Sequence, residues 1–333
     1  MYELIGPNSY CVYYEELEYI FIALRNLTSF PKKKYLNKIY KNMEQQKIEG
    51  KYRPLYEIMQ SICEDFCLGF LEFLIEFDME KFSLDRYEAY LISLPKEEFL
   101  TTYFCGIPKE EIVEAIEGEE GKQKFFEKYA DTFSQYLSFE MFFDHTQTWI
   151  AQFFSYVKSL MNEQTKQCLE RKQADVLQQK EMLREKLKEK EPFAYSEELM
   201  GKNCYYRGPY QTFYFMPSVY FPGLYVRIFR KDQFLIFDYN GIEEKRANVP
   251  EQLKALADQT RYGILLLLKK EEHLTGVEVA KKMKLATSTV SHHMNILRDS
   301  GLVHEEPVGS TKYYSISLRS LQNCIKVLQD TFL

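Results

Sequence analysis

The sequence predicts a mainly α-helical protein with small β content. It predicts a helical N-terminal region with a small antiparallel β segment, followed by a C-terminal domain of short helices and one hairpin. Apolar residues recur at helical spacing over most of residues 1–160. Short β-branched and aromatic runs gather within residues 211–239. Only 14 glycines occur in 333 residues, and no glycine-rich phosphate-binding motif is found, which argues against the common nucleotide-binding folds.

Residues 1–160 form the first expected domain, a candidate for effector binding or dimerisation. Its stretches with helical spacing are residues 55–77 after Pro54, a segment that begins after Pro108, and residues 121–136 and 139–160. The chain holds 26 Tyr and 25 Phe residues but one Trp. Two interpretations of these aromatic residues stay open: a core or dimer interface, or the wall of a small-molecule pocket.

Residues 161–192 differ in composition and are rich in Lys, Glu and Gln. Leu169, Val176 and Leu183 lie seven residues apart, but polar residues between them weaken the coiled-coil pattern. We expect one long, exposed, charged helix with a narrow apolar edge. This edge would pack on the N-terminal region or on a partner subunit.

Residues 193–245 change to a strand pattern. Three β-branched or aromatic runs cover residues 211–217, 224–230 and 233–239. Only Lys231 and Asp232 separate the last two runs, which predicts a β-hairpin. We expect this segment to pack with the N-terminal domain.

Residues 246–333 carry the most specific pattern. Two short helices are expected within residues 249–270, and Thr275 with Glu278 three residues later predicts a capping box that opens a third. A fourth helix runs from Thr287 to Gly301, followed by a hairpin and a last amphipathic helix. This order is that of a winged helix-turn-helix.

The same segment resembles the DNA-binding domain of ArsR-type (arsenic-repressor-like) bacterial regulators, over about 80 residues. The matching stretches are LKALADQTRYGILLLL, VEVAKKMKLATSTVSHHMNILRDSGLV and VGSTKYYSIS. The matching positions are Leu253, Leu256, Arg261, Ala280, Met283, Thr289, Val290, Ser291, His293, Met294, Leu297, Gly301, Leu302, Val303, Gly309 and Tyr314. The resemblance implies that the helix over residues 287–301 enters the major groove of double-stranded DNA.

Short donors and acceptors at the start of that helix suit the edges of bases. The expected base contacts are Thr287, Ser288, Thr289, Ser291 and His292. The expected phosphate contacts are Arg298, Lys312 and Arg261, although each could instead be a solvated surface charge. Of the adjacent histidines we expect one to pack, with His293 partly buried, and the other to meet phosphate.

Two departures from the family pattern bear on DNA binding. Glu305, Glu306, Pro307 and Ser310 occupy the hairpin, or wing, so the wing is less basic than in many relatives. Ala286 stands where a capping serine is usual, so Thr287 or Ser288 should cap the helix, or the helix should start later.

The distribution of charge, cysteines and histidines argues against metal binding and enzymatic activity. The net charge is −6, but residues 249–333 hold 11 basic and 9 acidic residues, so the positive balance lies there. The positions of the family's cysteine metal box hold Thr275, Gly276 and Val277, and we expect no metal or other cofactor. Cys63 and Cys67, four residues apart, are expected to be buried, with a soft-metal or arsenical pair or a thiol sensor as the alternatives. His145 beside Asp144 could act as a base, but a surface role is expected and no enzymatic activity is predicted.

The residues and the resemblance together predict a cytoplasmic, DNA-binding transcriptional regulator. We expect a repressor that acts as a homodimer on a palindromic operator and has an N-terminal region for an unknown small-molecule effector or for dimerisation. No signal peptide and no membrane span are expected. The alternative is a ligand-binding or enzymatic protein whose winged helix serves protein contacts.

Overall fold

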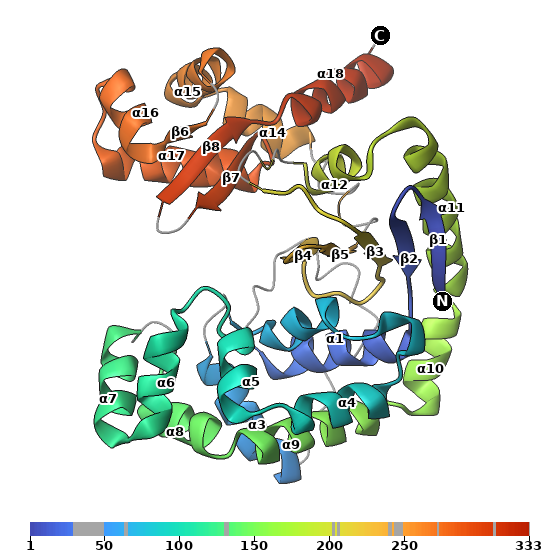
Figure 1. Ribbon diagram of the computed structural model, residues 1–333. Helices are drawn as coiled ribbons and strands as arrows, with labels where there is room; N and C mark the ends of the chain where they lie inside the picture. Colours follow the sequence, from blue (N-terminus) through green and yellow to red (C-terminus); the bar gives the residue numbers. More distant parts are fainter. Residues whose placement is uncertain are drawn as a thin grey trace. The chain divides into compact units, whose positions relative to one another are not determined.

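The structure is a computed structural model, and its helices and small sheets confirm the expected fold class (Figure 1). It describes all residues except 29–49, 63–65, 130–132, 202–203, 205–206, 239–241, 243–248, 272, 309–310 and 333. Cys63, Gly309 and Ser310 therefore lie outside the described residues. The chain forms two compact units: unit 1 is Met1–Lys188 with Tyr210–Asp238, and unit 2 is Glu189–Pro209 with Tyr239–Leu333. None of the described helices is both long and apolar enough to cross a membrane.

Unit 1 consists of a helical region and a five-stranded sheet. Its helices are α1 (Glu15–Leu27), η1 (Gly50–Tyr52), α3 (Arg53–Ser61), η2 (Gly69–Ile75), η3 (Met79–Lys81), α4 (Leu84–Ser93), α5 (Lys96–Tyr103), α6 (Lys109–Glu117), α7 (Glu119–Lys128), α8 (Tyr136–Asp144), α9 (Thr146–Ser159), α10 (Glu163–Glu170) and α11 (Gln173–Glu189), the last ending one residue into unit 2. Its strands are β1 (Tyr2–Gly6), β2 (Ser9–Val12), β3 (Phe213–Pro217), β4 (Tyr225–Phe229) and β5 (Gln233–Phe237).

The sheet has the order β1-β2-β3-β5-β4. The β4–β5 pair is antiparallel, which confirms the expected hairpin, whereas β3 runs parallel to both β2 and β5. The sheet is thus mixed and larger than expected, because it includes two strands at the N-terminus. Aromatic rings line up across it: Tyr10 stacks on Tyr214 at 5.7 Å between ring centres, and Tyr214 stacks on Phe234 at 5.6 Å.

The stretch over residues 55–77, expected as one helix, is broken. Helix α3 ends at Ser61, and the next residue, Ile62, is extended and forms an isolated bridge with Phe133. The later part, Gly69–Ile75, is a 3₁₀ helix. The ring of Tyr103 packs so closely on Gly69 that a Cβ there would lie 2.8 Å from ring carbons, so the local packing requires glycine.

Other expected helices are also divided. Residues 139–160 fall into α8 and α9, which meet at His145, and residues 161–192 contain α10 and α11 rather than one helix. The turn between α10 and α11 allows both Leu169 and Val176 to be buried in the core of unit 1. Helix α11 lies beside β1 (Figure 1), and its Lys180 binds Glu3 at 3.1 Å.

Aromatic side chains fill the core of unit 1. Phe70 stacks on Trp149 at 4.7 Å and on Phe153 at 4.0 Å between ring centres. The largest fully buried side chains are all aromatic and lie in this unit. The described aromatic residues therefore serve mainly as core, the first of the two interpretations.

A buried carboxylate joins α1 to the segment after β3. Glu18 is fully buried and accepts hydrogen bonds from Ser218 Oγ at 2.9 Å and from the backbone amides of Val219 and Tyr220 at 3.1 and 3.0 Å. Burial raises the pKa of Glu18 to about 7, although these three donors oppose the shift.

Within unit 2, residues 249–332 have the expected winged helix-turn-helix order. The start of the 193–245 segment differs from the expectation, because residues 192–200 form a helix and belong to unit 2 rather than to the N-terminal domain. The elements of unit 2 are α12 (Pro192–Met200), α14 (Val249–Leu256), α15 (Gln259–Lys270), β6 (Leu274–Thr275), α16 (Gly276–Met283), α17 (Thr287–Asp299), β7 (Val303–Val308), β8 (Thr311–Ile316) and α18 (Leu318–Phe332). The sheet order is β6-β8-β7. Apolar residues from α15, α16 and α17 form one core, which includes Ile264, Val279, Val290, Met294 and Leu297.

The ends of the helices in unit 2 follow the local sequence. Thr275 and Glu278 form the predicted capping box. Gly301, at φ +74°, follows α17, as expected for a residue that terminates a helix. α17 starts at Thr287, as its apolar spacing predicts, but the expected cap is wrong: the N-cap is Ala286, and neither Thr287 nor Ser288 caps the helix.

Candidate nucleic-acid interface

Helix α17 presents a polar face because its apolar residues are buried. Val290, Met294 and Leu297 are at most 1% exposed and recur at helical spacing, so the opposite face is turned to solvent. All five predicted base contacts lie on the surface: Thr287, Ser288, Thr289, Ser291 and His292 are exposed. The helix therefore carries a continuous row of short donors and acceptors.

One further exposed residue of this face, Asn295, is not among the contacts that the sequence predicts. Asn295 is exposed and lies one helical turn after Ser291. An amide can donate and accept at once, as contact with an adenine edge requires. The spacing of four residues could have identified it.

The N-terminus of α17 adds a second feature. Ala286 offers no side-chain acceptor, so no cap bonds the first amides of the helix. These amides and the exposed Thr287 and Ser288 lie at the positive end of the helix dipole. Such an end suits a phosphate oxygen.

The two histidines have different surroundings. His292 is exposed, whereas the side chain of His293 is 14% exposed. His293 Nδ1 lies 3.9 Å from Asp258 Oδ1, and Asp258 also accepts a hydrogen bond at 2.8 Å from the backbone amide of Arg261 at the start of α15. The expected partial burial of His293 is confirmed, and it places His293 against α15.

Arg261 is engaged within the domain. Its Nε donates to the carbonyl of Ala255 at 2.8 Å, and its Nη2 donates to the carbonyl of Lys254 at 2.9 Å. The side chain is 15% exposed. These bonds satisfy the last carbonyls of α14, so they favour a structural role for Arg261 over a phosphate contact.

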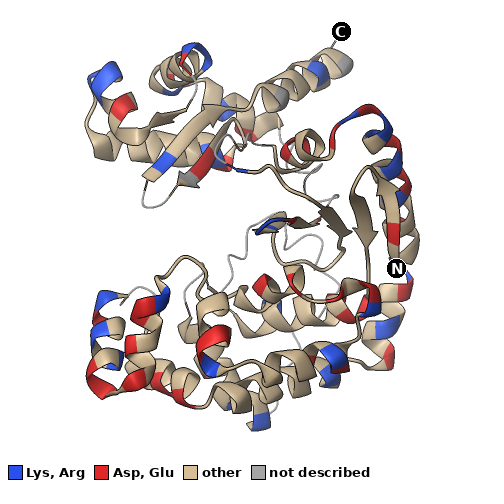
Figure 2. Cartoon of the chain, in the orientation of Figure 1, with Lys and Arg blue, Asp and Glu red and all other residues tan. Residues whose placement is uncertain are grey.

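Arg298 and Lys312 meet at one carboxylate. Glu305 accepts from Arg298 Nη1 at 3.3 Å and from Lys312 Nζ at 3.0 Å. In Figure 2, basic colour on β8 lies beside acidic colour on β7. The two expected phosphate contacts are thus brought together, but by an acidic residue between them.

The neighbouring residue of the wing behaves differently. Glu306 is 5% exposed, and its carboxylate oxygens have no hydrogen-bond partner among the described residues. It lies next to Glu305 on β7, where successive side chains point to opposite faces. The wing, which the sequence predicts to be less basic, therefore has one acidic residue paired with two cations and a second that is buried without a cation partner among the described residues.

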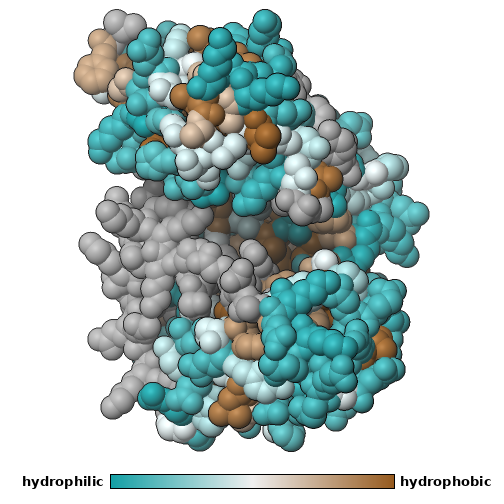
Figure 3. Space-filling view, turned by 90° about the vertical axis from the view of Figure 1, so that its left-hand side faces the viewer, coloured by the Kyte–Doolittle hydropathy of each residue, from teal (hydrophilic) through white to brown (hydrophobic). Residues whose placement is uncertain are grey.

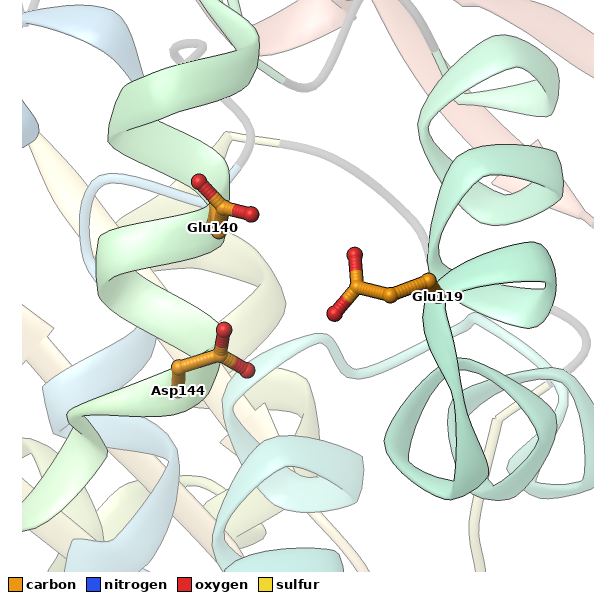
Figure 4. A group of neighbouring side chains, drawn as sticks. All are labelled: Glu119, Glu140 and Asp144. Carbon is orange, nitrogen blue, oxygen red and sulfur yellow. The ribbon is translucent and has the colours of Figure 1, made fainter.

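Among the described residues of unit 1, three acidic side chains lie close together. Glu119 on α7 and Glu140 and Asp144 on α8 point toward one another, with carboxylate oxygens within 4.8 Å (Figure 4). Lys122 Nζ already donates to Glu119 and Asp144, each at 2.8 Å. Burial alone would lower the pKa of Lys122, but these bonds raise it above its ordinary value. An ammonium thus already balances this cluster.

A pocket of about 340 Å³ lies beside that cluster. Its apolar lining comes from Leu91, Leu94, Phe99 and Ile150, and its polar lining is Lys96, Asp144, His145, Thr146, Gln147 and Thr148. His145 is exposed. The nearby surface of α6 and α7 is almost wholly hydrophilic (Figure 3). The pocket can accept a small molecule with both polar and apolar parts.

The elements of unit 2 and the polar face of α17 define a helix-turn-helix regulator of transcription. A family model described as "Bacterial regulatory protein, arsR family" matches residues 258–305. The chain belongs to this arsR family of bacterial regulatory proteins.

Three relatives show how far the similarity extends. The uncharacterized HTH-type transcriptional regulator MJ1325 of Methanocaldococcus jannaschii is 31% identical over 87 residues, which are 26% of this chain and 98% of the relative. The transcriptional repressor SdpR of Bacillus subtilis is 35% identical over 72 residues, 22% of this chain and 79% of the relative. The arsenical resistance operon repressor of Escherichia coli is 36% identical over 70 residues, 21% of this chain and 60% of the relative.

Proposed function

We propose that the protein is a cytoplasmic repressor that binds a palindromic operator as a homodimer and needs no cofactor for this. The polar face of α17 carries the proposal, because its five exposed side chains offer both donors and acceptors. Thr287, Ser288, Thr289, Ser291 and His292 would contact bases, together with Asn295. Arg298 and Lys312 would contact phosphate. Repressors among the relatives support the direction of regulation.

An apolar stripe on α18 supports the homodimer. Leu318, Ile325 and Phe332 lie seven residues apart and are 51, 56 and 77% exposed. Leu321 and Leu328 lie between them at heptad spacing and are half-buried. Such a stripe is costly in water, and a second copy of the same helix can cover it. In the dimer, two copies of α17 would enter successive major grooves about 34 Å apart.

Unit 1 would sense an effector or add to the dimer. The pocket between α4, α5 and α9 supports an effector of small size, since its lining combines apolar and polar groups. The dimer would exist in two conformations, one of which fits the operator. An effector bound in the pocket would favour one of these two conformations and so change DNA binding.

The test is DNA binding by the full-length double variant Ser291→Ala with His292→Ala. Fluorescence anisotropy on DNA from upstream of the gene should show loss of sequence-specific binding, with an unchanged circular dichroism spectrum. Gln322→Ala, which changes an exposed side chain on α18, is the control. Unchanged binding by the double variant would refute the role of α17. No DNA binding by the wild type would favour a winged helix that serves protein contacts.

A further inference from the structure

The wing contains an acidic side chain that forms ion pairs with both cations expected to contact DNA phosphate. Glu305 on β7 pairs with Tyr314 on β8, and Lys312 lies two residues before Tyr314 on the same face. This diagonal position brings the Glu305 carboxylate to 3.0 Å from Lys312 Nζ. Arg298, near the end of α17, reaches the same carboxylate at 3.3 Å.

The exposure of the three side chains shows which of them can meet a ligand. Glu305 is 17% exposed, whereas Arg298 is 39% and Lys312 is 57% exposed. The carboxylate therefore lies beneath two cations that remain open to solvent. Tyr314 also contacts it: burial and the Glu305 carboxylate both raise the pKa of the tyrosine.

We propose that Glu305 acts as an internal competitor of DNA phosphate for Arg298 and Lys312. This inference rests on the proposed function, and it adds a control on the affinity of the same surface. A phosphate oxygen that approaches either cation has to displace a carboxylate oxygen that already neutralises it. Cations paired in this way also release fewer counterions when DNA binds. A single winged helix would thus bind DNA weakly, and the dimer would need both of its copies.

Isosteric removal of the charge tests the proposal. Glu305→Gln should raise the affinity of the full chain for a random-sequence DNA duplex roughly tenfold at ~0.1 M salt, because Lys312 loses its carboxylate partner and Arg298 keeps only its contact with the exposed Asp299. The slope of log affinity against log salt should become steeper by about 1 to 2. Both quantities follow from anisotropy titrations at several salt concentrations.

Two further variants test whether the effect of Glu305→Gln comes from its ion pairs or from the loss of any negative charge on the wing. Glu306→Gln removes the same charge at the next position of β7, which bonds to neither cation, and should change the affinity by less than about twofold. Glu305→Gln should also give no gain in a background that carries Arg298→Gln and Lys312→Gln. Thermal unfolding checks that all variants are folded.

The outcomes distinguish this proposal from the proposed function. If the wild type binds operator through α17 but Glu305→Gln leaves the affinity and the salt slope unchanged, the competing role of Glu305 is refuted, whereas the proposed DNA-binding function is not. An equal gain from Glu306→Gln would also refute it. If neither the wild type nor Glu305→Gln binds DNA, both proposals fail. If only Glu305→Gln binds, the competitor is supported.

Discussion

The imidazole of His293 lies 3.9 Å from the carboxylate of Asp258 and so links α17 to the first turn of α15. Asp258 itself caps α15 by accepting from the backbone amide of Arg261, and this bond lowers the pKa of Asp258. His293 thus faces α15 from the buried side of α17, while the neighbouring His292 is exposed. Two adjacent residues of one type thus have different surroundings.

We predict that alanine at the two histidines affects different properties, namely stability at His293 and DNA binding at His292. His293→Ala should destabilise unit 2 by about 1 to 3 kcal/mol, because it removes a largely buried side chain between two helices. His292→Ala should leave stability unchanged and weaken DNA binding. Hydrogen exchange of α15 and α17 peptides and anisotropy titrations measure the two effects. Equal losses of stability in both variants would contradict this division.

Arg261→Gln should reduce stability rather than phosphate binding. The variant loses charged hydrogen bonds to the carbonyls of Lys254 and Ala255, which should cost about 1 to 3 kcal/mol in local stability. The salt dependence of DNA binding should stay the same. Arg298→Gln is the matched comparison. A shallower salt slope in Arg261→Gln would show that Arg261 does contact phosphate.

Ile325→Glu should prevent the proposed dimer. It places a charge at the middle of the heptad stripe on α18, where the wild-type side chain is 56% exposed. Sedimentation should then show a monomer at concentrations where the wild type is a dimer. The control is Lys326→Glu, since Lys326 is exposed and lies outside the stripe. A variant that remains dimeric would place the interface elsewhere.

Glu18 should make the stability of unit 1 depend on pH. Its pKa is about 7 in the folded protein against an ordinary value of 4.5, so the folded state keeps a proton that the unfolded chain releases between these pH values. The free energy of unfolding should therefore fall by about 3 kcal/mol as pH rises from 4.5 to 7, and the contribution should then stay level. Urea unfolding followed by fluorescence of the single tryptophan, Trp149, measures this.

The control for this prediction is the pair Glu18→Gln and Glu120→Gln. The first variant should remove most of the pH dependence, whereas the second changes an exposed carboxylate and should keep it. A wild-type stability that rises over this pH range would mean that other groups outweigh Glu18.

The sequence predicts unit 2 well because its signals are local. The Thr275–Glu278 capping box and the glycine after α17 depend on residues a few positions apart, and the structure confirms both. The cap of α17 differs from the expectation because the missing capping serine neither moves the helix start nor brings in Thr287 or Ser288 as a cap. The packing of Val290 and Met294 holds the helix in place.

Unit 1 is less predictable because distant residues decide its local structure. Ile62 leaves the helical path to pair with Phe133, and Gly69 is set by the ring of Tyr103. Neither partner can be identified from spacing along the chain. The same holds for the interface: Glu305 meets Arg298 and Lys312 only through the register of β7 and β8.

The parallel pairing of β2 with β3 has a consequence for how the chain is made. Cys11 lies opposite Phe215 in the sheet, yet most of the protein is synthesised between them. During synthesis on the ribosome, β1 and β2 emerge early, and β2 cannot pair with β3 until residues 213–217 have been made. A fragment that stops at Lys188 would leave β2 as an open edge, prone to pair with other chains. Expression of unit 1 alone therefore requires the Tyr210–Asp238 segment to be joined back to it.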